Sequence, residues 1–200
     1  MVIDKHIQGL IFDLDGTIAD SLPVHLDAWN IVCSEFGYTF PEEKLYEMTG
    51  MPTIDFANYI KADSNCEWSA EEIMKMKQQA FHNNLHKVRA IDAVVAIVKK
   101  YSTRLPLTVG TGGSRKSAHA ILHHLNLGSY FDFVVTASDV STHKPSPETF
   151  LKCAILMDVR PKNCLVFEDG QKGIEAAIAA DMPYVDVRNY AFHINNPVNA

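Results

Sequence analysis

Two carboxylates stand two residues apart directly after a short apolar run, in residues 9–17 (GLIFDLDGT). Asp13 and Asp15 would repel each other there unless a proton or a cation compensated their charge. Paired acids of this kind can act as a nucleophile and as a general acid and base. Gly16 permits a tight turn that directs both side chains inward. The segment therefore indicates an active site that other parts of the chain complete.

The elements that would position this pair are short apolar runs without polar alternation, which are typical of strands buried on both faces of a sheet. They cover residues 10–12, 105–109, 131–135, 165–167 and 184–187. Predicted helices lie between them, over residues 91–100, 114–126, 147–157 and 173–180. This alternation predicts an α/β fold with a doubly wound, Rossmann-like parallel sheet.

Residues 20–88 differ from the rest of the chain because they carry only helical signals, over residues 22–36, 53–62 and 69–86. Gly50 and Pro52 break the chain between two of these helices. We therefore expect a small all-helical cap inserted after the first strand. The predicted domains are a catalytic core of residues 1–19 and 89–200 and a cap of residues 20–88.

Polar groups follow four of the predicted strands at the point where each strand ends. In open α/β sheets, ligands bind beyond the carboxyl ends of the strands, so these groups are expected to gather at one edge. They are Asp13, Asp15, Thr111, Lys144, Glu168 and Asp169. Four acids in one crevice require a hard cation with oxygen ligands, which predicts Mg²⁺. A cation, a lysine and hydrogen-bond donors at one point describe a phosphoryl-transfer site.

The two aspartates would divide the work at such a site. Asp13 is placed to attack phosphorus and form an aspartyl-phosphate. Asp15 is placed to protonate the leaving oxygen and then to deprotonate the attacking water. A helix that begins near Ser114 adds an N-terminus, which attracts anions. The residues expected to hold the phosphate and the substrate beside it are Thr111, Gly112, Gly113, Ser114 and Lys144.

The same residues resemble four motifs of the haloacid dehalogenase superfamily of phosphohydrolases, in order along the chain. D-x-D-G-T is residues 13–17, the threonine after a strand is Thr111, the lysine of K-P-x-P is Lys144, and the acid pair is Glu168 and Asp169. Within that superfamily the chain is similar to the β-phosphoglucomutase-like branch, and most of all to bacterial fructose-1-phosphate and 6-phosphogluconate phosphatases. The resemblance implies a small α-helical cap.

The resemblance also implies how a metal would be held. It implies Mg²⁺ bound by Asp13, by the main-chain carbonyl of Asp15 and by Asp169. For Glu168 it leaves open a direct contact with the metal and a contact through water. Thr111 resembles one half of the pair that holds the phosphate, the other half being the lysine of K-P-x-P.

Residues of the predicted cap distinguish a phosphatase from a mutase. A mutase must hold a second phosphate, for which arginine is well suited. Related mutases carry a lysine and an arginine where this chain has Thr49 and Thr53, so we expect water to be the acceptor. His25 falls where the mutases have a histidine at the cap hinge. It is expected either to touch the substrate or to gate Asp15.

We therefore predict a Mg²⁺-dependent phosphatase that acts on a small sugar phosphate such as fructose 1-phosphate or 6-phosphogluconate. One alternative is a β-phosphoglucomutase, against which the cap threonines argue. Another is a non-catalytic module that senses phosphorylated metabolites. That module would lack the nucleophile or the lysine, whereas Asp13 and Lys144 are both present.

Composition and charge limit the classes of partner and the cellular location expected for this chain. The net charge of −6 argues against a nucleic-acid binder with a basic face. No apolar run is long enough for a membrane helix, and the N-terminus does not resemble a secretory signal. The cysteines, none in a C-x-x-C pair, are expected to be buried thiols; they are Cys33, Cys66, Cys153 and Cys164. We expect a cytoplasmic monomer. The lysines at 75, 77, 87, 99 and 100 are expected mostly on solvated helix faces, although a lysine of the cap could reach the substrate.

Overall fold

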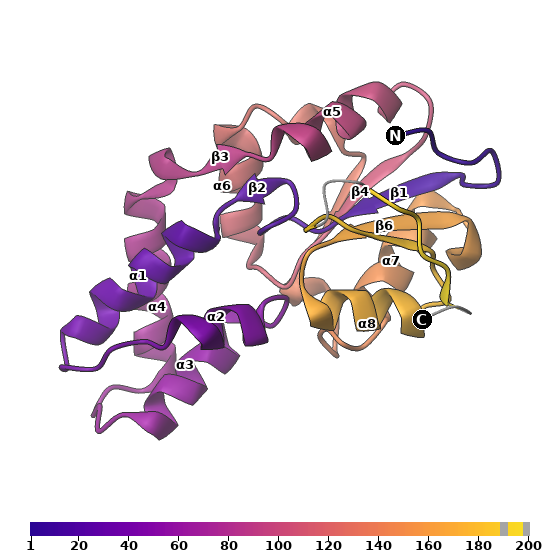
Figure 1. The fold of residues 1–200 in the computed structure, drawn as a ribbon. Helices are drawn as coiled ribbons and strands as arrows, with labels where there is room; N and C mark the ends of the chain where they lie inside the picture. The colour runs from indigo at the N-terminus through magenta and orange to yellow at the C-terminus, as the bar shows by residue number, and fades with distance from the viewer. Residues whose placement is uncertain (189–191, 198–200) are drawn as a thin grey trace.

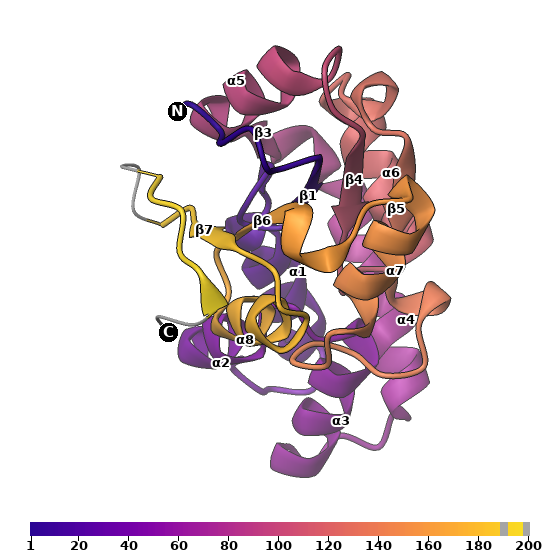
Figure 2. The same cartoon turned by 90° about the vertical axis from the view of Figure 1, so that its right-hand side faces the viewer.

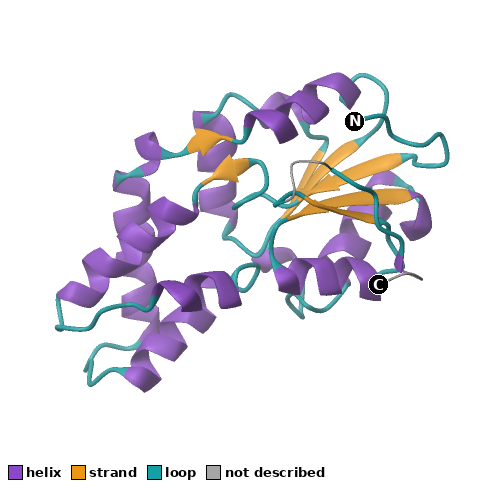
Figure 3. Ribbon diagram, viewed as in Figure 1, coloured by secondary structure: helices purple, strands orange, loops and turns teal. Residues whose placement is uncertain are grey.

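A parallel sheet forms the centre of the computed structural model, which describes residues 1–188 and 192–197 (Figures 1 and 3). Within these residues the sheet has five strands in the order β5-β4-β1-β6-β7, and all neighbouring pairs are parallel. The strands are β1 Gly9–Phe12, β4 Leu107–Gly110, β5 Phe133–Val135, β6 Cys164–Glu168 and β7 Tyr184–Asp186. Each coincides with a predicted apolar run, so the predicted parallel sheet is confirmed.

Helices cover both faces of this sheet, as Figures 1 and 2 show. They are α5 Asp92–Tyr101, α6 Arg115–His124, α7 Glu148–Met157 and α8 Gln171–Ala179. Alternate residues of β1 separate the two layers. Leu10 and Phe12 belong to the hydrophobic cluster that includes Val98 of α5, whereas Ile11 belongs to the cluster that includes Phe150 of α7. The fold is therefore doubly wound, as predicted.

The buried strands read as unbroken apolar runs because both of their faces are covered. Every residue of β1 and of β4 is buried. Phe12 stacks on Phe167 of the neighbouring strand with ring centroids 4.6 Å apart. Such a pair contributes about 0.5–1.5 kcal/mol beyond the area that it buries. This packing makes the centre of the sheet a rigid base for the residues that follow the strands.

Helices α1 to α4 form a separate bundle beyond the carboxyl edge of the sheet (Figure 1). They are α1 Leu22–Ser34, α2 Glu42–Met48, α3 Thr53–Asp63 and α4 Ala70–Asn83. Trp29 of this cap is buried and packs against Phe40 and Phe56 at centroid distances of 5.6 and 5.7 Å, and those two rings lie 6.4 Å from each other. A capping box joins Ser69 and Glu72 at the start of α4. The predicted helical cap is confirmed.

Two features of this region were not predicted. Helix α2 is only seven residues long and follows Pro41, which has no side-chain acceptor to mark a helix start. A two-stranded antiparallel ribbon also joins cap and core, formed by β2 Ala19–Asp20 and β3 Arg89–Ala90. Strands of two residues carry no periodicity that a sequence could reveal. The ribbon therefore places Asp20, the first residue of the predicted cap, in a strand.

The remaining predictions about the chain concern its cysteines and its ends. All of the cysteines are free and buried, as expected. Within the described residues, no helix is both long enough and apolar enough to cross a membrane. The sequence gives no clear prediction for residues 188–200, and residues 189–191 and 198–200 lie outside the described part.

Candidate active site

The carboxyl edge of the sheet brings three charged side chains together from three separate elements. Asp13 directly follows β1, and Glu168 is the last residue of β6 beside it. The loop between β5 and α7 supplies Lys144, whose side chain is fully buried. Its Nζ donates to Asp13 Oδ1 at 2.6 Å and to Glu168 Oε1 at 3.2 Å. One buried ammonium therefore lies between two buried carboxylates.

The electrostatics of this group depend on burial as much as on pairing. Burial, followed by the charge on Glu168, raises the pKa of Asp13 above its usual range, although Lys144 opposes the shift. Burial would lower the pKa of Lys144, but the charges of Asp13 and Glu168 outweigh burial and raise it. Lys144 thus stays charged, and its single ammonium does not compensate the negative charge that the cluster would carry with every acid ionised.

A third acid completes a cluster that fits a metal ion. Carboxylate oxygens of Asp13, Glu168 and Asp169 lie within 4.8 Å of one another. Burial, and then the charges of Glu168 and Asp13, raise the pKa of Asp169. The Thr17 hydroxyl orients Asp169 by donating to its Oδ1 at 2.7 Å. Oxygen ligands of this kind suit a hard divalent cation, which would relieve the repulsion that the pKa shifts report.

The turn after β1 is shaped for this cluster. Gly16 has a φ of 87°, in the left-handed region that favours glycine. A Cβ atom at Gly16 would lie 2.2 Å from Asp169 Oδ2. Only glycine therefore allows the turn to pass so close to the acid. This agrees with the tight turn expected at this position.

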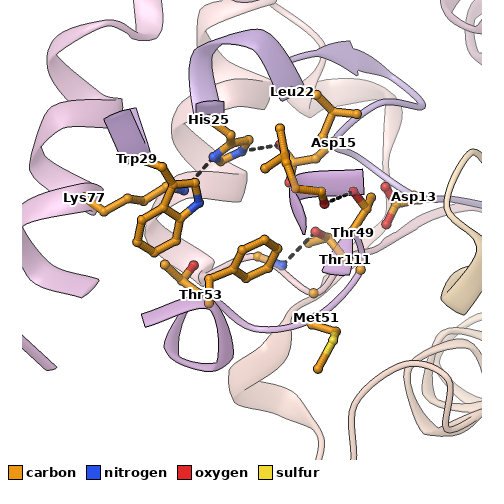
Figure 4. Close-up of a pocket in the computed structure, with 15 residues that line it drawn as sticks. Asp13, Asp15, Leu22, His25, Trp29, Thr49, Met51, Thr53, Lys77 and Thr111 are labelled. Atoms are coloured by element: carbon orange, nitrogen blue, oxygen red, sulfur yellow. Dashed lines mark hydrogen bonds and ion pairs between the residues drawn. The ribbon is translucent and has the colours of Figure 1, made fainter. Parts of the chain in front are cut away.

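Asp15 lies in a different environment from Asp13. Its Oδ1 accepts a hydrogen bond from the Ser21 hydroxyl at 2.6 Å and lies 3.0 Å from His25 Nε2. His25 Nδ1 in turn lies 2.6 Å from Lys77 Nζ, and the imidazole stacks on Phe81 at 4.1 Å. Figure 4 shows this row of side chains running from Asp15 through His25 to Lys77. Of the two roles expected for His25, the structure shows contact with Asp15.

The contacts among Asp15, His25 and Lys77 also favour particular protonation states of these residues. Burial, followed by the charge of Lys77, lowers the pKa of His25, and burial lowers the pKa of Lys77 to about 8. A charged Lys77 has only donors, so His25 Nδ1 accepts and Nε2 carries the proton that faces Asp15. Burial would raise the pKa of Asp15, but His25, the Ser21 hydroxyl and Lys77 together lower it. These partners therefore favour the carboxylate form of Asp15, which must take up a proton before it can act as an acid.

Lys77 corrects an expectation, since the sequence places it on a solvated face. It is only 4 % exposed, and its Nζ lies 5.1 Å from the centre of the Trp29 ring. It occupies the buried face of α4 together with Ile73 and Ala80. That spacing of i, i+4 and i+7 is a signal that could have revealed it. Burying a lysine among apolar residues costs free energy unless a polar or charged partner offsets it. A lysine on the buried face of a helix is therefore a candidate for a functional role.

The loop after β4 presents the predicted phosphate-binding residues. Thr111 is buried, and its Oγ1 accepts from the Gly113 amide at 2.9 Å. That amide is therefore partly engaged within the loop. The hydroxyl of Ser114 accepts from the Ser117 amide at 3.2 Å and caps α6. Thr111, Gly112 and Gly113 line the same cavity as Asp13, whereas Ser114 lies beside a neighbouring cavity.

This catalytic cavity, of about 60 Å³, lies where the cap meets the core (Figure 4). Both parts of the chain line it, with Asp13, Asp15, Leu22, His25, Trp29, Leu45, Thr49, Gly50, Met51, Thr53, Phe56, Lys77, Thr111, Gly112 and Gly113. Thr49 turns its hydroxyl to the Leu45 carbonyl at 2.8 Å. A Cβ atom at Gly112 would lie 2.1 Å from the Gly50 carbonyl oxygen. The cap is thus seated directly on the loop after β4.

The family of the chain follows from comparison with known sequences. The profile of the haloacid dehalogenase-like hydrolases matches residues 10–187, a range that contains every residue of the site described above. The chain belongs to this family. The four motifs found in the sequence therefore reflect membership of this family.

Individual relatives of this haloacid dehalogenase-like hydrolase include both phosphatases and mutases. The fructose-1-phosphate phosphatase YqaB of Escherichia coli is 41% identical over 184 residues, which cover 92% of this chain and 98% of that protein. The β-phosphoglucomutase of Bacillus subtilis is 26% identical over 188 residues, covering 90% of this chain and 83% of that one. The crystal structure of β-phosphoglucomutase from Clostridium difficile superposes with a TM-score of 0.80 at 24% identity, over 90% and 83% of the two chains. The last match shows a shared fold.

Proposed function

We propose that this protein is a divalent-metal-dependent phosphatase that hydrolyses a small sugar phosphate through an aspartyl-phosphate. One observation carries the proposal: two aspartates that are two residues apart have opposite surroundings. Asp13 lies against Lys144 and the acid cluster, whereas Asp15 lies against Ser21 and His25. Titratable groups whose surroundings differ in this way are suited to separate roles in one reaction.

In the proposed reaction, Asp13 attacks phosphorus and the bond to the ester oxygen breaks. Lys144 lies 2.6 Å from Asp13 and would neutralise charge on the phosphoryl oxygens. A proton on Asp15 passes to the departing alkoxide, and Asp15 then takes a proton from the water that attacks the aspartyl-phosphate. The contact between Asp15 and His25 would hold the carboxyl in place through both steps.

We assign the metal site to Asp13, Asp169 and the main-chain carbonyl of Asp15, with Glu168 as a further ligand. The family generally uses a divalent metal, and the buried carboxylates that lie within 4.8 Å of one another fit one. Mg²⁺ is proposed because it prefers oxygen ligands and leaves positions for phosphate oxygens. When bound, the cation would reduce repulsion between the nucleophile and the phosphate.

A phosphatase is favoured over a mutase by the cap side of the cavity. Thr49 and Thr53 line it where related mutases are expected to carry cations. Lys77 is the lysine on that wall, and it is engaged by His25 at 2.6 Å. A second phosphate would therefore find little positive charge there. The similarity to a fructose-1-phosphate phosphatase supports the same choice. The cytoplasmic location and the monomeric state stay predictions.

Phosphate release from a panel of phosphorylated metabolites, with and without Mg²⁺, tests the proposal. We expect release from at least one sugar phosphate, and Asp13→Asn is expected to reduce it to background because the nucleophile is lost. Asp27→Asn, an exposed acid in the cap, is the control and should keep full activity. Faster conversion of β-glucose 1-phosphate to the 6-phosphate than release of phosphate would show a mutase instead. Tight ligand binding without turnover across the panel would show a sensor.

A further inference from the structure

The catalytic cavity is too small for the substrate that the proposed function requires. Its volume is about 60 Å³, whereas pockets that enclose small organic ligands measure roughly 300–1,000 Å³. A second cavity, of about 340 Å³, adjoins the catalytic cavity, and Thr53 and Gly112 line both. In Figure 4, Thr53 lies on the opposite side of the catalytic cavity from Asp13. A ligand with its phosphate at Asp13 would therefore reach the second cavity at Thr53.

The second cavity, which we call the distal cavity, combines apolar lining residues such as Ile54 and Met74 with uncharged polar side chains. Gln78 of α4 faces it from the cap, and Ser138 and His143 face it from the loop between β5 and α7. In the described part of the chain, the side chains of these three residues make no hydrogen bond to another residue. Neither carboxylates nor lysine or arginine side chains are among the described residues that line it. Such a lining suits hydroxyl groups of a neutral ligand.

A third cavity, of about 660 Å³, adjoins the catalytic cavity on another side through Leu22 and Thr49. It is larger, but its charged lining residues are three acids, Asp20, Asp92 and Asp169, together with Arg188. Covering these charges with an uncharged sugar would cost solvation free energy, so this cavity suits a neutral group less well. The loop after β4 contributes Gly112 and Ser114 to the distal cavity instead, so that cavity continues from the phosphate-binding loop itself.

On the basis of the proposed function, we propose that the sugar end of the substrate passes Thr53 into the distal cavity, where Gln78, Ser138 and His143 bind its hydroxyl groups. The ligand class is a monophosphate whose remaining part is an uncharged polyol or sugar ring. Gln78 is a specificity-determining residue because its amide offers both donors and an acceptor. A phosphate ester too short to pass Thr53 makes none of these contacts.

Gln78→Leu tests this subsite because it keeps the size of the side chain and removes its hydrogen bonds. The measured quantity is kcat/KM for the best sugar phosphate of the panel divided by kcat/KM for acetyl phosphate, which is too short to reach the cavity. We expect this ratio to fall about tenfold, as for the loss of one hydrogen bond. Gln79→Leu is the matched control, since Gln79 is exposed, pairs with Asn83 at 2.8 Å and lines neither cavity.

A second pair of variants tests the cavity by filling it. Ser138→Trp places a large ring at the exposed wall of the distal cavity and is expected to raise KM for the sugar phosphate at least fivefold relative to acetyl phosphate. Ser141→Trp, at an exposed position outside the lining, is the control. An unchanged ratio in both Gln78→Leu and Ser138→Trp overturns the subsite. A wild-type protein that releases phosphate from no ester overturns the proposed function instead.

Discussion

Asp13 and Asp15 show how two identical side chains, separated by one leucine, acquire different properties. Asp13 is buried among other acids, which raises its pKa, while its contact with Lys144 keeps it aligned. Asp15 is only partly buried, and its polar partners lower its pKa. Lys77 is the most distant of the groups that affect Asp15, since it contacts His25, which in turn contacts Asp15. At the scale of the residue, the effect of Lys77 on Asp15 can be tested by the pH dependence of catalysis.

Lys77→Met is expected to move the pH limb that reports Asp15 to higher pH. The charge of Lys77 is one of the causes that lower the pKa of Asp15, so its removal raises that pKa. The measurement is the pH dependence of kcat/KM for the best sugar phosphate. Lys75→Met, an exposed lysine on the same helix, should leave the profile unchanged. A Lys77→Met profile that overlays the wild type, or moves to lower pH, would contradict this role.

Sequence reasoning reached some of these residues and missed others. The pair Asp13 and Asp15 stands out because acids after an apolar run require an explanation. His25 was assigned two possible roles, and its contact with Asp15 could not be chosen from the sequence because it depends on the orientation of α1. Lys77 was missed because it lies 52 residues from His25 in the chain and was interpreted as a solvated charge.

At the scale of elements, the loop after β4 and the loop between α2 and α3 meet without any side chain between them. Gly112 and Gly50 form this contact. Because the obstacle at Gly112 is a backbone oxygen, it cannot turn away as a flexible side chain would. The fit of cap on core therefore depends on the absence of one methyl group.

Gly112→Ala is expected to lower kcat/KM at least tenfold, since the new Cβ atom would lie 2.1 Å from the Gly50 carbonyl oxygen and hold the cap off the loop. The melting temperature should change by less than about 3 °C, because the clash lies between two parts that can separate. Gly128→Ala is the control, as nothing lies within 4 Å of a Cβ atom at that position. Unchanged kinetics in Gly112→Ala would show that the contact is not needed.

The helices and strands differ in how clearly local sequence patterns predict them. The three central strands β1, β4 and β6 were predicted because their complete burial leaves unbroken apolar runs, whereas the outer strands β5 and β7 are only partly buried. The long cap helices were predicted from helical signals in the sequence, and the structure adds that Ser69 caps the start of α4. Helix α2 and the ribbon of β2 and β3 are held by tertiary packing, which local patterns do not record. The assignment of residues 20–88 to a separate domain stays a prediction.

At the scale of the whole molecule, the acids that meet at the carboxyl edge come from two distant segments. Residues near the first strand and near the sixth place Asp13, Glu168 and Asp169 within 4.8 Å of one another. Their mutual repulsion opposes folding in the absence of a cation, so stability and metal binding are linked. The sequence could predict that these acids converge, but not the shape of the cavities, which depends on how the cap rests on the core.

Mg²⁺ is expected to raise the melting temperature of the metal-free protein. At a concentration of about 100 times its Kd, a ligand of the native state adds about 2.7 kcal/mol, which corresponds to roughly 5–11 °C for a chain of this size. Asp169→Asn should lose most of that response, because it removes one carboxylate from the cluster. Without metal it should be at least as stable as the wild type, since one of the repelling charges is gone.

Differential scanning calorimetry in EDTA and in Mg²⁺ measures both effects. Asp181→Asn is a suitable control because it changes an exposed acid at a φ of 56°, a conformation that asparagine also tolerates. A wild-type melting temperature that does not respond to Mg²⁺ would contradict the metal site while leaving the fold unaffected.

The ribbon of β2 and β3 has a consequence for how proteins of this architecture diversify. Ala19 pairs with Ala90 and Asp20 with Arg89, so the polypeptide leaves and re-enters the α/β body at adjacent points. Any insert whose two ends lie about 5 Å apart meets that requirement. A tight Asn-Gly turn would meet it as well and would give a lidless enzyme. An exchanged insert would change the cap side of the substrate cavity, but it would also have to supply a new partner for Asp15 in place of His25 and Lys77.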